Sequence, residues 1–281
     1  IPGSKPTAVV TMQKLLLSGS DVFYGLYETR SDDRGETWSP LREIPSLNRW
    51  KEGNGVEAVI CDATPKWHAR TNTLLLLGQT VRYTGDRVMA DPRPRETAYA
   101  AWDIRTGQWS SPAMLEMPDA NRYFSSGSGS AQRVDLPDGD VLIPFYAKPK
   151  TPARHEYESG VARCGFDGKK LTVKAIGSHH TVGHARGLYE PSITSYAGRF
   201  FLTLRNDEAG YVTSSDDGLN YHEPKLWCFD DGQPLGNYNT QQHWVSHSDG
   251  LYLVYTRRGL NNDHVFRHRA PLAMARVDPQ K

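Results

Sequence analysis

Short apolar segments alternate with turns along the whole chain. Segments 23–27, 141–143, 200–204 and 251–255 are rich in Val, Leu, Ile, Tyr, Phe and Thr, and turn-forming residues bound each of them. No stretch of about a dozen residues keeps an apolar stripe of helical periodicity without a Gly or Pro interrupting it. The pattern therefore predicts an almost all-β protein.

Turns built on Asp and Gly recur between these segments. They occur at residues 33–35, 103–107, 167–168 and 217–218, and each joins two strand-like segments. Repeated hairpins of this kind are the units from which the blades of a β-propeller are built. We therefore expect a β-propeller.

Two of these turns share a longer motif, Ser-x-Asp-x-Gly-x-Thr-Trp, with Asn and Tyr at the last two places of the second copy. Its Ser, Asp, Gly and aromatic positions are Ser31, Asp33, Gly35 and Trp38 in the first copy and Ser214, Asp216, Gly218 and Tyr221 in the second. In such a turn the Asp carboxylate caps the backbone, Gly supplies a positive φ, and the aromatic ring packs beneath the hairpin. The motif indicates a fold rather than a catalytic centre.

The two motifs are similar to the Asp-boxes of the sialidase superfamily, and the chain resembles that family over most of its length. The resemblance implies an all-β, six-bladed propeller whose active site lies where the blades converge. About five blades are visible here, so we expect one propeller domain over residues 1–281 that is cut short at its C-terminal end. The expected blades are 5–48, 55–118, 127–178, 186–230 and 240–281. The resemblance also implies a secreted or periplasmic protein.

The resemblance assigns roles to individual residues. Segments 188–192 and 204–207 are similar to the blade in which a sialidase Glu polarises a tyrosine nucleophile and an Arg helps to grip the substrate carboxylate. These positions are Glu190 and Arg205 here. Asp21 lies near the place of the acid/base Asp, and Asp62 matches the Asp of an Asp-Pro pair that points into the site, with Ala in place of Pro. The tyrosine nucleophile would follow Lys281, and the region of the family's Arg-Ile-Pro motif reads Gly-Ser-Lys-Pro at positions 3–6.

The segment from Tyr255 to Arg269 is dense in Arg, Asn and His. Because Arg pairs with a carboxylate bidentately and does not lose its charge, this composition indicates an anionic ligand. In a strand, Arg267 and Arg269 would face the same side. By spacing we favour Arg267 as the next arginine of the carboxylate-binding cluster, and we expect Arg258 and His264 to contact substrate as well.

Further candidates come from other parts of the expected propeller. Gln242 and His243 open the fifth blade beside a Trp, and amides with an aromatic face suit a sugar. His68, His243 and His264 belong to three separate blades, whose strands could bring them together at the centre. There a His would suit proton abstraction near neutral pH.

Three functions fit these candidates. The first is an exo-acting glycoside hydrolase that removes a terminal acidic sugar from an extracellular glycan, with Asp21 as proton donor, Glu190 activating a tyrosine, and Arg205 with Arg267 holding the carboxylate. The second is a polysaccharide lyase acting on a uronic-acid glycan. Its base and neutralising groups would be His68, His243, His264 and Tyr255. The third is a non-catalytic glycan-binding propeller.

The composition of the chain limits the classes of partner that we expect it to bind. The 33 basic and 32 acidic residues give a formal charge of +1, which argues against a dedicated nucleic-acid-binding protein. No apolar run approaches the length of a membrane span. We expect an anionic carbohydrate substrate, because the arginines favour negative charge, and neither a cofactor nor a metal. His179, His180 and His184 lie close together, but no carboxylate or Cys with suitable spacing supports a zinc site.

Overall fold

The computed structural model describes residues 1–16, 21–151 and 156–280. Their secondary structure is almost entirely β, which confirms the predicted fold class. The exceptions are two short 3-10 turns, η1 (Pro45–Leu47) and η2 (Phe266–His268). No helix within the described ranges is long and apolar enough to cross a membrane.

Five antiparallel sheets follow one another along the chain. The first has the order β1 (Ala8–Leu15), β2 (Phe23–Ser31), β3 (Arg42–Glu43). The second has the order β10 (Ala113–Met114), β8 (Thr97–Asp103), β6 (Thr73–Thr84), β5 (Val56–His68), β4 (Trp50–Gly53), with β7 (Arg87–Val88) beside β6 and β9 (Gln108–Trp109) beside β8.

The remaining three sheets are built in the same antiparallel way. The third has the order β11 (Ser125–Gly127), β13 (Val141–Lys148), β14 (Glu158–Phe166), β15 (Leu171–His180), with β12 (Val134–Asp135) beside β13. The fourth has the order β16 (Tyr189–Tyr196), β17 (Arg199–Arg205), β18 (Tyr211–Ser215), β19 (Lys225–Leu226), and the fifth the order β20 (His243–His247), β21 (Gly250–Tyr255), β22 (Ala273–Val277).

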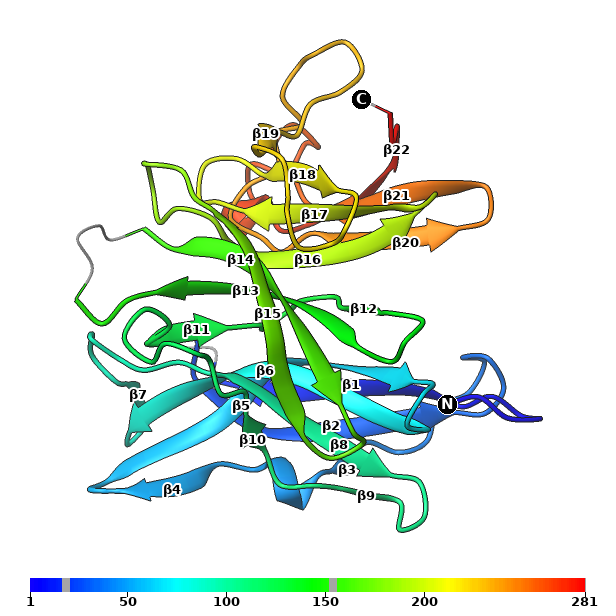
Figure 1. The fold of residues 1–281 in the computed structure, drawn as a ribbon, viewed down its shortest axis with the longest axis vertical. Coiled ribbons are helices and arrows are strands. Elements are labelled where there is room, and N and C mark those ends of the chain that lie inside the picture. Colours follow the sequence, from blue (N-terminus) through cyan, green and yellow to red (C-terminus); the bar gives the residue numbers. More distant parts are fainter. Residues whose placement is uncertain (17–20, 152–155, 281) are drawn as a thin grey trace.

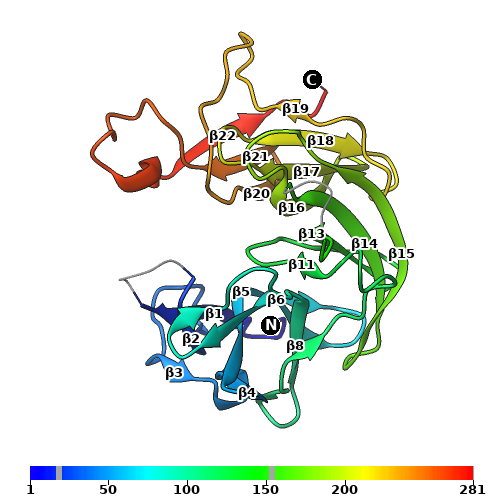
Figure 2. The ribbon, with the colours of Figure 1, turned by 90° about the vertical axis from the view of Figure 1, so that its left-hand side faces the viewer.

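The sheets are arranged as an arc (Figures 1 and 2). Figure 2 shows β1 and β2 near one end of the arc, the long strands β14 and β15 at its middle, and β20 to β22 near the other end. The five sheets lie within residues 8–43, 50–114, 125–180, 189–226 and 243–277. This arrangement is that of consecutive blades of a β-propeller.

Neighbouring sheets are joined by apolar cores, and β6 shows how the sequence produces them. All but the last residue of β6 are buried. Leu74 and Leu76 pack toward the core shared with the first sheet, whereas Leu75 and Leu77 pack toward the core shared with the third sheet. Because side chains alternate between the two faces of a strand, a continuous run of leucines supplies both cores.

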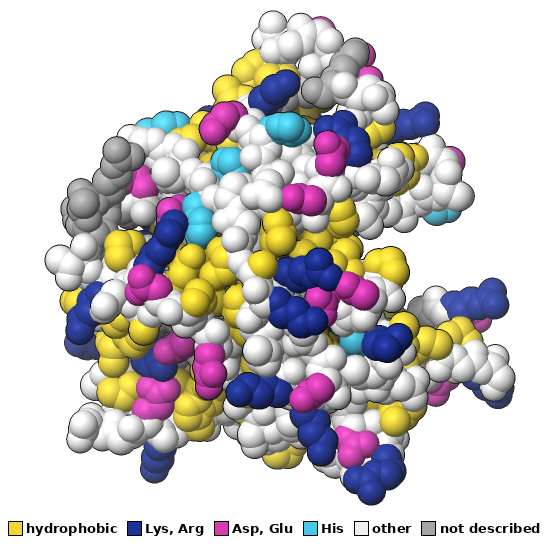
Figure 3. Space-filling view, viewed as in Figure 1, with side chains coloured by type: hydrophobic (Ala, Val, Ile, Leu, Met, Phe, Trp, Pro, Cys, Tyr) yellow, Lys and Arg dark blue, Asp and Glu magenta, His cyan; other side chains and the backbone are white. Residues whose placement is uncertain are grey.

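The surface carries both signs of charge in close mixture. On the face shown in Figure 3, Lys and Arg side chains lie among Asp and Glu side chains. Asp140, for example, accepts hydrogen bonds from Arg163 Nε at 2.7 Å and from Lys174 Nζ at 2.5 Å.

The first Ser-Asp-Gly motif forms the turn that the sequence predicts. Ser31 Oγ donates to Asp33 Oδ1 at 2.7 Å, and Gly35 N donates to Ser31 Oγ at 2.7 Å. Hydrogen bonds from the Thr37 side chain and backbone lower the pKa of Asp33 to about 2. The Trp38 indole donates to the Gly35 carbonyl at 3.2 Å and remains 44% exposed, so this ring covers the turn from outside.

The second motif lies one residue later than predicted. Ser215 Oγ donates to Asp217 Oδ1 at 2.9 Å, and Asp217 Oδ1 accepts from the backbone N–H groups of Leu219 at 2.8 Å and Asn220 at 2.7 Å. Ser214 instead binds Arg199, and Asp216 is exposed. The reason is that Gly218 follows its Asp directly, so the turn is one residue shorter than the first. Tyr221 is buried in the core between the third and fourth sheets, as the motif predicts.

Candidate functional site

A buried ion pair lies at one end of the fourth sheet. Arg205 is the last residue of β17, and its guanidinium donates a hydrogen bond to the Glu190 carboxylate of β16. The Arg205 and Glu190 side chains are only 6% and 12% exposed. A break in register between Tyr189 and Ser192 places Glu190 at a φ of 45°. Such bulges re-aim side chains and are frequent next to active sites.

The environment changes the acidity of Glu190. Burial raises the pKa of the Glu190 carboxyl, and the neighbouring Arg205 charge opposes this rise without cancelling it. A buried carboxyl group whose pKa is shifted and that lies beside a fixed cation is typical of functional sites.

A second arginine reaches the same place from the fifth sheet. Arg205 Nη2 donates to Asn239 Oδ1 at 2.6 Å, and Arg269 Nη2 donates to the Asn239 backbone oxygen at 3.0 Å. Two guanidinium groups therefore meet at one asparagine. This is a suitable arrangement for binding a carboxylate.

The structure offers Arg269 as the partner of Arg205, whereas spacing favours Arg267. The segment is not the strand assumed in that prediction. Its 3-10 turn η2 has Arg267 at a φ of 55° and His268 at 53°, so strand alternation does not apply. Arg267 lies against its neighbour Phe266, with Cζ 4.9 Å from the ring centroid.

The aromatic ring of Tyr189 packs against the Arg205 guanidinium group. Its centroid lies 4.7 Å from Arg205 Cζ and 4.6 Å from Arg186 Cζ, so the ring contacts two guanidinium groups. The Tyr189 hydroxyl donates to Asp207 and accepts from Arg186 Nη2 at 2.6 Å. The hydrogen bonds from Arg186 lower the pKa of Asp207 to about 2. Sequence analysis did not identify this group, although Asp207 follows Arg205 by two positions along the chain.

A second carboxylate comes from the second sheet. Asp62 lies in a bulge of β5 at a φ of 52° and accepts a hydrogen bond from Gln79 Nε2 at 3.0 Å. Burial raises its pKa. Gly127 and Gly129 allow the close approach of Gln79, since a Cβ at either position would lie 2.4 Å from that side chain. This contact explains the glycines at positions 127 and 129.

Tyr146 is linked to Asp62 through Gln79 and lies near Glu190. Its hydroxyl donates to Gln79 Oε1 at 2.6 Å, and Arg95 donates to the same hydroxyl. Burial raises the pKa of Tyr146, and the charges of Glu190 and Asp62 are near enough to contribute to this rise. Strands of the second, third and fourth sheets thus form one polar cluster.

Asp21 lies at the exposed edge of this region. Its backbone oxygen accepts a hydrogen bond from Tyr83 Oη at 2.6 Å, and the same hydroxyl accepts from Phe23 N at 2.9 Å. The Asp21 charge is among those that raise the pKa of Asp62, so the two carboxylates are close enough to repel each other. The Asp21 side chain is exposed and has a φ of 63° at its backbone.

Three sequence candidates have structural roles elsewhere. His68 is the last residue of β5 and is buried, and its ring nitrogens bond Thr71 Oγ1 at 2.8 Å and the Gly139 oxygen at 3.0 Å. Gln242 is buried and accepts a hydrogen bond from Thr203, and Tyr255 packs in the core of the fifth sheet. All three side chains are buried.

The other candidates lie on or near the fifth sheet. His243 is half-buried at the start of β20, and burial lowers its pKa. His264 is exposed. Arg258 lies over Tyr238, with Cζ 3.8 Å from the ring centroid, and the Tyr238 hydroxyl is hydrogen-bonded to His268 Nδ1 at 2.5 Å. Arg258 thus contacts Tyr238, the residue that precedes Asn239 in the chain.

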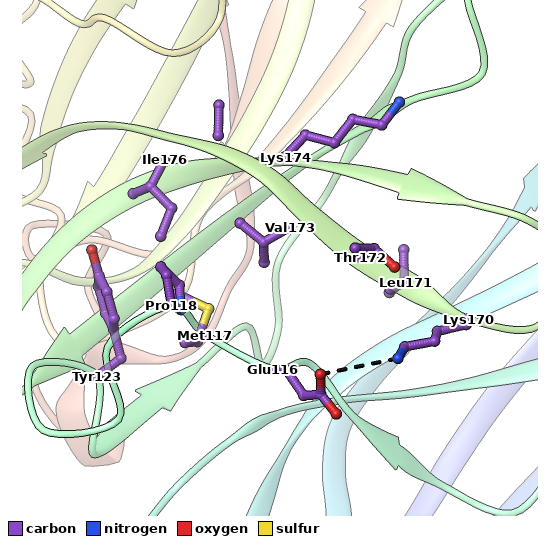
Figure 4. A pocket seen from close by; sticks show the side chains of 11 residues that line it. Glu116, Met117, Pro118, Tyr123, Lys170, Leu171, Thr172, Val173, Lys174 and Ile176 are labelled. Carbon is purple, nitrogen blue, oxygen red and sulfur yellow. Dashed lines mark ion pairs between the residues drawn. The ribbon is translucent and has the colours of Figure 1, made fainter.

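A pocket of about 530 Å³ lies apart from this cluster, on the third sheet. It is lined by residues 116–118, Tyr123 and residues 170–176 of β15 and its approach (Figure 4). Its charged groups include Glu116 and Lys170, which pair with each other at 4.0 Å. The lining contains none of the candidate residues, so we do not assign the site to this pocket.

Comparison with known proteins identifies the fold. No protein-family model and no curated protein matches the sequence. Among solved structures, Trypanosoma rangeli sialidase matches with a TM-score of 0.68 and 16% identity over 97% of this chain and 45% of that chain. The same sialidase in complex with sialic acid gives a TM-score of 0.66 and 14% identity over 97% and 44%. The Hadza microbial sialidase Hz136 gives 0.62 and 13% over 89% and 50%.

The chain spans about half the length of these structures. The similarity extends over most of this chain at low identity, so it concerns the fold. The chain has the fold of the sialidase superfamily.

Proposed function

We propose that the protein is an exo-acting glycoside hydrolase that removes a terminal acidic sugar from an extracellular glycan. The observation that supports this function best is the buried Glu190–Arg205 pair, with Arg269 meeting Arg205 at Asn239. The sialidase-type fold and the complex of Trypanosoma rangeli sialidase with sialic acid support the same substrate class.

Each group has a role that its environment suits. Arg205 and Arg269 hold the sugar carboxylate, because guanidinium groups pair with carboxylates and keep their charge. Asp21, exposed at the edge of the site, donates a proton to the departing glycosidic oxygen. Glu190 is buried behind the arginines and polarises the attacking group. Asp62, with its raised pKa, binds a hydroxyl or amide of the sugar.

The proposal is tested by the release of aglycone from a chromogenic α-sialoside. We expect turnover by the wild type and a loss of at least about 100-fold in kcat/KM for Glu190→Gln and Arg205→Ala, since each removes a charged group from the substrate site. Arg199→Ala is the matched control, because Arg199 lies at the opposite end of β17 and also pairs with a carboxylate. Its turnover should stay within about threefold of the wild type. Well-folded wild type without turnover would contradict the proposal.

The lyase is the second candidate. Of its four groups, His68 and Tyr255 are buried in structural positions, which weakens it. Tyr238 with His268 beside the arginines is the observation that still favours a base at this place. A uronic-acid polysaccharide that yields an unsaturated product, detected by its ultraviolet absorbance, would support the lyase over the hydrolase. Binding of either glycan without turnover would support a glycan-binding protein.

A further inference from the structure

Four arginines near the end of the described chain have no acidic partner. Most arginines of the sheets bind Asp or Glu, as Arg82 does with Glu52 at 2.7 Å and Glu96 at 2.8 Å. In contrast, no ion pair with any described residue is formed by Arg257, Arg258, Arg267 and Arg269. This segment therefore concentrates positive charge that the protein itself does not neutralise.

Three side chains of this segment, two of them arginines, contact the same two residues. Arg258 lies over Tyr238, His268 is hydrogen-bonded to the Tyr238 hydroxyl, and Arg269 donates to the Asn239 oxygen. Asn239 is also the partner of Arg205. The positive segment is thus continuous with the proposed carboxylate site.

The segment is fixed in position by a buried asparagine. Asn262 is 1% exposed, and its amide donates to the oxygens of Arg257 at 3.0 Å and Ala270 at 2.8 Å. Arg258 N also donates to the Gly236 oxygen at 3.1 Å. A ligand would therefore meet charges that are already held in place, which lowers the entropic cost of binding.

An exposed aromatic ring accompanies these charges. Phe266 is 75% exposed and lies against Arg267, and Leu272 is 73% exposed. Figure 2 shows this part of the chain, in orange to red, projecting from the end of the arc. An aromatic face with guanidinium groups beside it suits an acidic sugar, whose ring packs on the aromatic and whose carboxylate pairs with arginine.

The arginines are close enough to repel one another. Burial lowers the pKa of Arg269, and the charges of Arg205 and Arg267 lower it further. The acidic and imidazole groups of this segment are Asp263, His264 and His268, and Asp263 is paired with His268 at 3.2 Å. The Glu190 carboxylate of the fourth sheet also acts on Arg269, and its charge opposes the lowering of the Arg269 pKa. A bound anion would relieve this repulsion. One sugar carboxylate is sufficient for Arg205 and Arg269, which leaves Arg258 and Arg267 for a second anion.

We propose that Arg258 and Arg267 bind the second sugar of an acidic oligosaccharide whose terminal acidic sugar lies at Arg205 and Arg269. This inference rests on the proposed function and names its substrate class. The substrate is a glycan with negative charges on consecutive sugars, rather than a single acidic sugar on a neutral chain.

The test is calorimetric titration with sialic acid and with a linear trimer of sialic acid. We expect the wild type to bind the trimer at least about tenfold more tightly than the monomer at low salt, and this gain to shrink as salt screens the exposed charges. Arg258→Ala/Arg267→Ala should lose the gain and keep its affinity for the monomer. The single variant Arg267→Ala removes the contact of Arg267 with its neighbour Phe266. It should lose part of the gain in affinity for the trimer.

Arg276→Ala is the matched control. Arg276 is an exposed arginine of β22 in the same sheet, and it bonds the Asp249 backbone oxygen at 3.0 Å. This variant should keep the full gain for the trimer. Equal affinity of the wild type for monomer and trimer, or a gain retained in the double variant, would overturn the inference and leave the proposed function standing. Binding of the trimer without turnover of the trimer or of the chromogenic α-sialoside would instead contradict the proposed function.

Discussion

At the scale of single residues, burial and hydrogen bonding give the carboxylates of this protein different acidities. Burial raises the pKa of Glu190 and of Asp62, whereas hydrogen bonds from Arg186 lower that of Asp207 to about 2. Because of such differences, one carboxyl group can hold a proton while another stays permanently charged. Here Asp207 is permanently charged and keeps Tyr189 and, through its ring, Arg205 in place.

The lowered pKa of Asp207 predicts a pH-dependent contribution to stability. Since the folded pKa is below the usual value of 3.8, this contribution is full above that value and is lost as the pH falls toward 2. Asp207→Asn should therefore unfold more easily than the wild type by about 1 kcal/mol at pH 7, because solvent partly screens the pair. The difference should vanish near pH 2. Urea denaturation of both proteins across this range measures it, and a difference that persists unchanged at pH 2 would exclude this cause.

At the scale of elements, local sequence determines the strands but not the bulges that aim the site residues. The periodicity of apolar residues and the Asp–Gly turns predict the hairpins, because both are local features. The bulges at Asp62 and Glu190 and the 3-10 turn at Phe266–His268 interrupt the regular alternation, and no such local pattern marks them. For this reason, spacing in the sequence favours Arg267 as the second carboxylate-binding arginine, whereas the geometry of the structure favours Arg269.

The shift of the second Ser-Asp-Gly turn leads to a stability prediction. Asp217→Ala removes the caps of two backbone N–H groups and should destabilise the protein by about 1–2 kcal/mol, as loss of a capping side chain does. Asp216→Ala is the control, because Asp216 is 83% exposed and should change stability by less than about 0.5 kcal/mol. Guanidinium denaturation compares the two. If Asp216→Ala were the more destabilising variant, the capping Asp of the motif would be Asp216, as the sequence predicts.

At the scale of the whole molecule, the arc of sheets brings together residues that are far apart in the chain. Asp62, Glu190 and Arg269 come from three different sheets, and the polar cluster forms only because neighbouring sheets pack through shared cores. The sequence suggests Glu190 and Arg205 by resemblance to sialidases. It does not show that Asn239 joins Arg205 to Arg269, since no local pattern relates these three residues.

The most direct test of the account is a crystal structure of the protein with sialic acid. We predict that the sugar carboxylate lies within hydrogen-bond distance of the Arg205 and Arg269 guanidinium groups, with Glu190 behind them. Matched crystals of Arg205→Ala should show no sugar at this place. Sialic acid bound elsewhere, such as in the pocket beside β15, with the Arg205 site free of ligand, would contradict the account.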